Sequence, residues 1–580
     1  MKPFFICLFL LFTLSSFAQC DAVNSLLRKG DRFLQQSTPN YQEAINAYTA
    51  AIIACPERAR EGQRRIANMV NGINDLRVQA VEAQAGAASA LEQVKLAQEE
   101  SQQALNKANK LVDAFYFYED RFALAYGDNR QYYFIDKKGN LVEKLGRWER
   151  AEQFDCRGYA KVRKRNDNQD YLLDTLGNTY AVAYNLADLH SVTTCLDLDK
   201  QQLAALPDSL WTHTQLQVLL LNENKLTALP DAIASLQQLK DVQLFKNALT
   251  SLPESFGQLQ QLNALKLSYN ALEHLPESFG QLKQLRSLDL AGNSLSGLPE
   301  NFTQLQNLTS LSLFSNSLAD LPKDFGQLNK LRTLDLGINS LSNLPESFLQ
   351  LENLGTLTMS SNKLENLPTN FGQLQRLEVL HLSSNALATL PQNFGQLRKL
   401  RTLHMSRNKL VSLPENFGQL QKLSTLTLRA NSLTELPESF GQLENLAELD
   451  LFKNSLSKLP DNFGRLGRLH TLNLLQNSLK SLPENFGELA NLSVLKLSSN
   501  ALNSLPESFG QLQHLEELDL NGNLLSTIPE RFGELQQLQS LDLGFNSLSN
   551  LPNSFGELQH LNWLNLQRNS LLYPTKKLAG

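Results

Sequence analysis

The stretch LPESFGQL occupies residues 252–259 and recurs letter for letter at residues 275, 436 and 505. A close variant, LPENFGQL, begins at residue 413. The proline of this stretch recurs every 23 residues from Pro207 to Pro552, sixteen times in all, without insertion or deletion. Self-similarity at one fixed period is typical of a solenoid, in which each turn packs on the turn before it. The period therefore predicts a repeat array.

Each 23-residue unit follows the frame L-x-x-L-x-L-x-x-N-x-L-x-x-L-P-x-x-F-x-x-L. The L-x-L step alternates with period two, so Leu265 and Leu267 are expected to point inward from a short strand, while Lys266 and Ser268 point outward. Stacked turns then place these strands side by side in parallel. The strands predict one long parallel sheet.

The polar letter of the frame is an asparagine that keeps the same 23-residue step. Its amide can bond backbone groups of neighbouring turns that would otherwise be buried without a partner. We expect it to form a structural ladder, represented by Asn224, Asn247, Asn270, Asn385 and Asn569.

After the strand, the leucine–proline step favours an extended residue followed by a helix-compatible one. We therefore expect a short helical turn with Pro253 at its first position, and Phe256, Leu259 and Leu262 closing the core.

These residues carry a close family resemblance. Residues 192–572 resemble leucine-rich repeats of the 23-residue class, as in Scribble- and Erbin-like scaffold proteins and in many bacterial proteins. The resemblance implies an α/β repeat solenoid, a curved horseshoe with parallel strands on its concave face. It also implies a protein that binds partners rather than one that transforms substrates.

Composition and motifs exclude several other classes. The formal net charge of −5 is made of interspersed acids and bases, so no basic field argues for nucleic acid. The sequence has no G-x-x-x-x-G-K-S/T loop, no H-E-x-x-H and no G-x-S-x-G, the usual carriers of nucleotide, zinc-protease and hydrolase chemistry. We expect no enzyme activity, no cofactor and no metal.

The N-terminus, MKPFFICLFLLFTLSSFAQC, has one lysine, an apolar run and small residues before a cut after Ala18. This pattern predicts a signal peptide over residues 1–18 and an exported protein, in the periplasm, at the cell surface or secreted. The apolar run is too short for a transmembrane segment. The alternative, cleavage before Cys20 and acylation of that cysteine, is disfavoured by Gln19.

Residues 24–58 resemble one tetratricopeptide (TPR-like) helical hairpin, with Ala44, Tyr48, Ala51 and Pro56 at the characteristic spacing. Cys20 and Cys55 bracket this antiparallel hairpin, so we expect them to form a disulfide if the protein is exported and Cys20 is not acylated.

The remaining cysteines, Cys156 and Cys195, are interpreted as small buried hydrophobic residues.

Residues 64–113 are rich in Ala, Gln, Glu and Lys and carry a heptad seam from Met69 to Leu111. The pattern predicts one long helix. Self-association as a coiled coil is one interpretation, and a helix that folds back or lies on its own chain is the other.

Residues 115–190 contain an internal echo in which YFIDKKGN at 133–140 matches YLLDTLGN at 171–178. Asp-x-x-Gly-Asn is turn chemistry between two β-rich runs. The segment resembles the bacterial WG-type β repeats, although the tryptophan–glycine pair is absent, and it predicts a small β module. Residues 573–580 form a tail after the array.

Because the frame repeats, specificity must lie in the positions that the frame leaves free. Outward strand positions carry aromatic, basic and acidic side chains, and His381 and His404 share one position in adjacent turns. An exposed aromatic beside charges is typical of a protein-binding anchor. The candidate concave-face residues are Phe245, Tyr269, Phe314, His381, His404, Arg407, Arg429, Glu448, Asp450 and Phe452.

The sequence therefore predicts an exported bacterial scaffold or recognition protein that engages a protein or peptide along its concave face. A glycan is the alternative ligand. The competing hypothesis is a structural array that spaces the N-terminal modules and binds nothing specific.

Overall fold

The computed structural model describes residues 117–119, 121–126 and 131–571, together with isolated helical positions between residues 29 and 69. Apart from those positions, the predicted leader, the Cys20–Cys55 disulfide, the 24–58 hairpin, the 64–113 helix and the 573–580 tail lie outside the described residues. The chain divides into two compact units, Met1–Asp197 and Leu198–Gly580.

The described part of the first unit is built from short β-strands. One antiparallel sheet contains β1 (Ala123–Tyr126), β2 (Tyr132–Ile135) and β3 (Arg147–Trp148). A second sheet contains β4 (Arg150–Ala151), β5 (Tyr159–Arg163), β6 (Asp170–Asp174) and β7 (Thr179–Ala183), with β8 (Cys195–Asp197) parallel to β7. The connections include the short 3-10 turns η2 (Glu143–Leu145) and η3 (Leu186–Asp188). A core of Phe122, Phe134, Leu145, Trp148, Phe154, Ala160, Val162 and Leu173 holds the unit together.

Two turns of the first unit are built alike. The Asp136 carboxylate accepts the backbone N–H of Asn140 at 2.8 Å, and 38 positions later the Asp174 carboxylate accepts the backbone N–H of Asn178 at 2.8 Å. Gly139 lies at φ 75°, a left-handed conformation that side chains disfavour. The two halves of the sequence echo therefore close their turns with the same bonds.

The interpretation of the two cysteines in this unit is half right. Cys195 is fully buried in β8, whereas Cys156 is exposed. Cys156 lies in the tight turn between Asp155 and Gly158, whose N–H donates to the Asp155 carbonyl at 3.0 Å. A side chain at the tip of such a turn faces solvent, so the prediction of a buried Cys156 was wrong.

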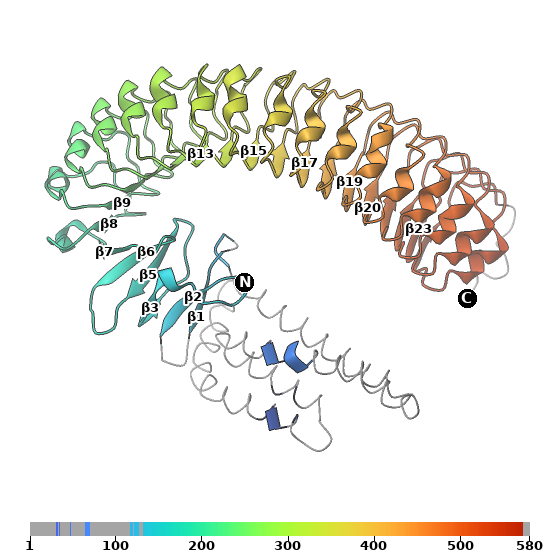
Figure 1. The fold of residues 1–580 in the computed structure, drawn as a ribbon, viewed down its shortest axis with the longest axis horizontal. Helices are drawn as coiled ribbons and strands as arrows, with labels where there is room; N and C mark the ends of the chain where they lie inside the picture. The colour runs from blue at the N-terminus through green and yellow to red at the C-terminus, as the bar shows by residue number, and fades with distance from the viewer. Residues whose placement is uncertain are drawn as a thin grey trace. The chain divides into compact units, whose positions relative to one another are not determined.

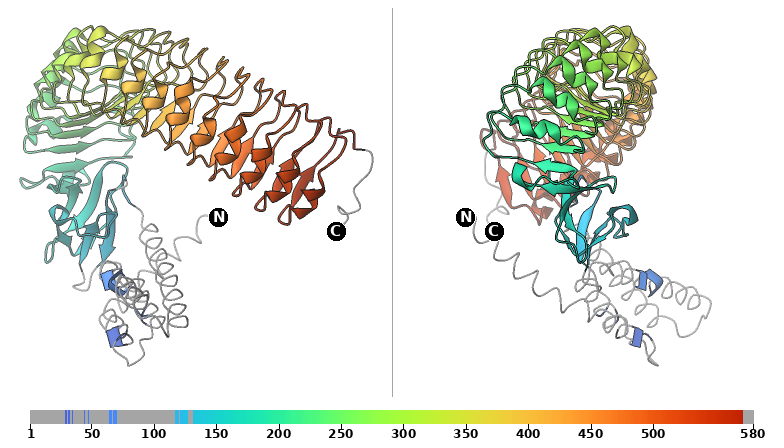
Figure 2. Two further views of the ribbon diagram at one scale, coloured as in Figure 1. Left: turned by 45° about the vertical axis from the view of Figure 1, so that its right-hand side comes forward. Right: turned by 90° about the vertical axis from the view of Figure 1, so that its left-hand side faces the viewer.

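The second unit is the repeat array, a curved solenoid in which the strands line the inner side and the helical turns line the outer side (Figure 1). In the turned views its turns stack on one another along the whole array (Figure 2). Its described strands, each three residues long, are β9 (Val218–Leu220), β10 (Asp241–Gln243), β11 (Ala264–Lys266), β12 (Ser287–Asp289), β13 (Ser310–Ser312), β14 (Thr333–Asp335), β15 (Thr356–Thr358), β16 (Val379–His381), β17 (Thr402–His404), β18 (Thr425–Thr427), β19 (Glu448–Asp450), β20 (Thr471–Asn473), β21 (Val494–Lys496), β22 (Glu517–Asp519), β23 (Ser540–Asp542) and β24 (Trp563–Asn565).

All neighbouring strands from β9 to β24 pair in parallel and in register, so the sheet is open and follows the curve of the array. The parallel solenoid predicted from the 23-residue period is confirmed, and so is the concave placement of the strands that the family resemblance implies.

The outer side carries one 3-10 helical turn per repeat. These turns are η4 (Asp208–Thr212), η5 (Asp231–Ser235), η6 (Glu254–Gln258), η7 (Glu277–Gln281), η8 (Glu300–Gln304), η9 (Phe325–Gln327), η10 (Glu346–Gln350), η11 (Phe371–Gln373), η12 (Phe394–Gln396), η13 (Phe417–Gln419), η14 (Glu438–Gln442), η15 (Phe463–Arg465), η16 (Glu484–Glu488), η17 (Glu507–Gln511), η18 (Glu530–Glu534) and η19 (Asn553–Glu557). Pro253 is the N-cap of η6 rather than its first helical residue, because its backbone is still extended at φ −70° and ψ 152°. The predicted position of the proline was therefore wrong by one residue.

The interior repeats one packing arrangement. Phe417 is fully buried, and its ring stacks on those of Phe394 and Phe440 with centroids 6.1 Å apart in both directions. Gly395 lies beside this column because a Cβ there would overlap the carbonyl oxygen of Asn416 in the next turn. The stacked phenylalanines therefore form a close-packed outer wall to the core.

The asparagine of the frame bridges turns. The Asn385 side chain donates to the carbonyl oxygens of Met359, at 2.9 Å, and Leu382, at 3.1 Å. Its own oxygen accepts the N–H of Leu364 at 3.0 Å. One side chain thus satisfies backbone groups in two consecutive turns, where water cannot reach them.

Candidate binding surface

The strand register arranges the concave face into columns. Leu380 pairs with Leu403 and His381 with His404, so each outward side chain lies beside the residue 23 positions away. Leu380 and Leu403 are buried inward, and the residues on either side of them in β16 and β17 are partly exposed. Neighbouring parallel strands lie about 4.8 Å apart, which brings side chains of one column into contact.

A second column begins just past each strand, where the backbone turns left-handed. In this column Tyr269, Ile338, Arg407 and Phe545 have φ between 50° and 57°, and Gly292 has φ 64°. Tyr269 and Phe545 are both 55% exposed. The turn therefore presents large side chains at the rim of the concave face, at some conformational cost for residues other than glycine.

His381 and His404 form the centre of the face. Their rings stack with centroids 4.5 Å apart and an interplanar angle of 5°. Thr358 and Thr427 continue the column on either side. Burial lowers the pKa of both imidazoles, and for His381 the neighbouring His404 lowers the pKa further. The pair is therefore neutral at pH 7 and resists taking up two protons.

Arg429 connects a charge and an aromatic ring in adjacent turns. Its guanidinium lies 3.3 Å from the Asp450 carboxylate and 5.1 Å from the centroid of the Phe452 ring. Burial raises the pKa of Asp450, and the nearby Arg429 offsets this only in part. Phe452 is partly exposed, so the three side chains form one mixed apolar and charged spot.

A similar spot lies near the start of the array. The rings of Phe245 and Tyr269 meet edge to face at 5.5 Å, and the Lys266 ammonium lies 5.0 Å from the Phe245 ring centroid. Lys266 was not among the predicted site residues, although the register alone places it one turn from Phe245.

The structure does not gather all candidate residues into one site. Phe245, Phe314 and Phe452 follow strands β10, β13 and β19 and are separate along the array. Arg407 projects from the rim, and its backbone N–H donates to the carbonyl of Arg429 at 2.7 Å. Glu448 begins β19 and lowers the cost of protonating His404 by its charge. The predicted residues therefore form a central group between β16 and β19 and two outlying aromatic spots.

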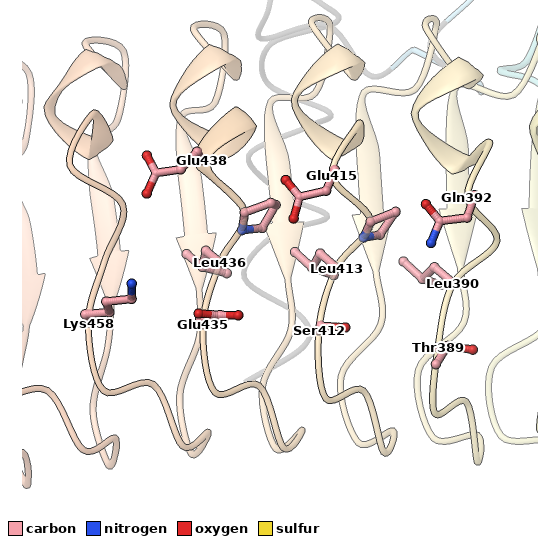
Figure 3. Close-up of a pocket in the computed structure, with 12 residues that line it drawn as sticks. Thr389, Leu390, Gln392, Ser412, Leu413, Glu415, Glu435, Leu436, Glu438 and Lys458 are labelled. Atoms are coloured by element: carbon pink, nitrogen blue, oxygen red, sulfur yellow. The ribbon is translucent and has the colours of Figure 1, made fainter.

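A shallow groove of about 430 Å³ lies on the flank where the chain runs from strand to 3-10 turn. Its floor is formed by Leu390, Leu413 and Leu436, and Figure 3 shows glutamates such as Glu415 and Glu438 along one side of it. The floor leucines are between 4% and 7% exposed, so the groove offers mainly polar contacts.

The described residues contain no group of three or more His, Cys, Asp or Glu side chains arranged to hold a metal ion. Among the helices in the described part of the chain, none is long and apolar enough to cross a membrane.

Three family models match the array. "Leucine-rich repeat region" covers residues 308–406, "Leucine rich repeat" covers residues 237–295, 467–525 and 514–571, and "Leucine Rich Repeat" covers residues 399–420. No curated protein matches the chain.

Solved structures also resemble this chain. A leucine-rich repeat protein of Leptospira interrogans is 37% identical, with a TM-score of 0.58 over 66% of this chain and 99% of that chain. Drosophila Toll, in its complex with Spätzle, is 20% identical, with a TM-score of 0.55 over 73% of this chain and 65% of that chain, and shows the fold alone. The functional domain of InlJ from Listeria monocytogenes is 22% identical, with a TM-score of 0.48 over 64% of this chain and 72% of that chain.

Proposed function

The chain belongs to the leucine-rich repeat family, and we propose that it is a non-catalytic binding protein that holds a protein or peptide against its concave strand face. The observation that carries this proposal is the Arg429, Asp450 and Phe452 spot, in which a partly exposed ring lies under a guanidinium on a rigid sheet. Aromatic and arginine side chains in such settings dominate the affinity of many protein interfaces.

The contrast between frame and face supports the proposal. Inward positions are leucine in turn after turn, whereas the column of Arg429 holds Phe245, Phe314 and Phe452 at irregular intervals. A spacer needs only the frame. An arrangement of different side chains on a rigid surface gives a partner the means to select one register.

We also propose that the protein is exported, because residues 1–18 have the charge and apolar pattern of a signal peptide. The partner would then be met in the periplasm, at the cell surface or outside the cell. Attachment through an acylated Cys20 and self-association through residues 64–113 remain alternatives to a soluble monomer.

The test is capture of a partner by the full chain, followed by titration of that partner against variants. Phe452→Ala should weaken binding by at least about 2 kcal/mol if the ring is an anchor, because its desolvated contact is lost. The matched control is Gln258→Ala with Gln260→Ala on the outer side of the array, which should leave affinity unchanged.

Four outcomes separate the hypotheses. Loss of binding in the concave variant alone supports recognition by this face. Loss of binding in the outer variant alone would show that the partner binds the outer side of the array, and would contradict the proposal. A saturable glycan in place of a protein would support the alternative ligand, and the absence of any saturable partner would support a spacer.

A further inference from the structure

One turn of the array differs from all others in charge. The turn Pro391–Leu413 contains five Lys or Arg side chains and no Asp or Glu. Each of the other fifteen turns, counted from its frame proline, contains at least one acidic residue. In a chain of net charge −5, this turn is a local reversal of sign.

The five cations surround the turn instead of clustering on one side. Arg398 and Lys399 follow η12, and Arg401 immediately precedes β17. Arg407 lies at the left-handed position beyond the strand, and Lys409 follows on the next flank. Arg401 immediately precedes β17 and Arg407 lies six positions later, a span of at most about 20 Å, so the cations border both edges of the concave face.

These side chains have little to neutralise them. All five side chains are exposed. Of these five, only Arg401 has an ion-pair partner among the described residues, and that partner is Glu378 at 3.9 Å. That pair is 60% and 57% exposed at its two side chains, so solvent screens it strongly. The turn therefore presents an unneutralised positive field to a partner.

Adjacent turns widen this field at the edge that precedes the strands. Arg376 and Lys422 lie one turn before and one turn after Lys399 in the same column, and both are exposed. His404, stacked on His381, occupies the concave floor between Arg401 and Arg407. We call the five cations of this turn, Arg398, Lys399, Arg401, Arg407 and Lys409, the cationic belt.

We propose that the cationic belt binds an acidic peptide segment of the partner, which crosses the concave face parallel to strand β17. This inference rests on the proposed function, because it names the chemistry of the segment that the face would hold. The belt steers the segment by charge, and the spot formed by Arg429 and Phe452, one and two turns beyond β17, receives its apolar side chain.

The rest of the face argues for a short acidic segment over a long uniform polyanion. The outward column that contains His404 also holds carboxylates, in turns before and after the belt. These are Asp289, Asp335, Asp450, Asp519 and Asp542. A polyanion lying along the array would be repelled by these groups. A segment lying across the array meets cations at both edges and the neutral imidazole of His404 between them.

The experiment measures binding of a fluorescently labelled peptide of about ten glutamates to the full chain by anisotropy. The belt variant is Arg398→Gln with Arg401→Gln. The matched control is Lys283→Gln with Arg286→Gln, which changes the same two positions of the frame in a turn that also contains Glu277 and Asp289. Thermal melts of both variants report whether each remains folded.

We expect the belt variant to weaken peptide binding at least about tenfold and the control to change it less than about twofold. Raising the salt from about 50 mM to about 300 mM should weaken binding to the unchanged protein, because added ions screen exposed charges. Equal losses in belt and control variants would overturn the proposal.

Two further arms separate this inference from its alternatives. A sulfated polysaccharide that binds the belt while polyglutamate does not would show that the partner class is wrong. Phe452→Ala should leave polyglutamate binding unchanged, because this probe has no apolar anchor, while it weakens the captured partner. If the partner depends on Phe452 but not on the belt, the inference fails and the proposed function stands. If the belt binds polyglutamate but the partner ignores Phe452, the proposed function fails instead.

Discussion

The interior of the array and its concave face are made by the same strands, yet they differ in kind. Leu403 is fully buried and pairs with another leucine in the next turn, whereas His404, one residue later, faces a partly exposed column of varied side chains. Alternation along a strand separates the two sets of residues at every turn. The comparison indicates that stability depends on the inward set and recognition on the outward set.

The largest test of this separation is Phe417→Ala. Its ring is fully buried between two parallel neighbours, so truncation removes stacking contacts and leaves a cavity. We expect a loss of about 3–5 kcal/mol in the free energy of unfolding, measured by denaturant titration. Phe545→Ala is the matched control, because that ring is 55% exposed and its loss should change stability by less than about 0.5 kcal/mol. Equal effects at the two sites would break the comparison.

The second test concerns the polar member of the interior. Asn385→Ala should reduce the free energy of unfolding by roughly 1–3 kcal/mol, because backbone groups of two turns lose their partner. Hydrogen exchange should show faster exchange at the N–H of Leu364, which the Asn385 oxygen accepts. Peptide binding by the cationic belt should be unaffected. An unchanged melt would refute this account of the asparagine ladder.

The third test lies at the rim, where the two regions meet. Ile338 is 47% exposed and has φ 50°, a conformation that is strained for a β-branched residue. Gly292 occupies the equivalent position at φ 64°. Ile338→Gly should therefore raise the free energy of unfolding by about 1 kcal/mol. Ser361→Gly, at φ 58° without β-branching, is the control and should gain less.

The test with the smallest expected effect changes the pH, which titrates His381 and His404 on the concave face. Burial holds the pKa of His381 and His404 below the ordinary histidine value, while Glu448 acts in the opposite direction on His404. The unfolded chain therefore takes up protons first as the pH falls. The neutral pair therefore contributes fully to the free energy of unfolding above about pH 6.5, and this contribution declines as the pH falls toward the folded pKa values.

We expect the melting temperature to fall more between about pH 7.5 and pH 5.5 in the unchanged protein than in His381→Gln with His404→Gln. Both proteins share every other titrating group on this face, including Glu448 and Asp450. Parallel pH profiles in the two proteins would show that the stacked pair does not titrate as its burial requires.

The sequence was most informative where one residue type repeats. The period predicted the stacked strands, their register and the neighbouring positions of His381 and His404, since each follows from counting 23 residues. The proline was placed one residue too far into the helical turn, because ring closure fixes its φ but leaves its ψ free, and ψ is extended at 152°.

Other features depend on contacts that counting cannot supply. The pairing of Arg429 with Asp450 and Phe452 is a rotamer choice in a crowded column. The exposure of Cys156 depends on a tight turn that its neighbours form. The cationic belt is encoded in the sequence, but its residues lie outside the strands, so the outward strand positions alone do not reveal it.

The asparagine bridges also have a kinetic consequence. Each joins residues only 21 to 26 positions apart, so no contact of the ladder requires distant parts of the chain to meet. Such a topology lets folding begin at any favourable pair of turns and spread in both directions. It also lets a weakened turn act as a boundary, so that the blocks on its two sides unfold in separate steps instead of one cooperative transition.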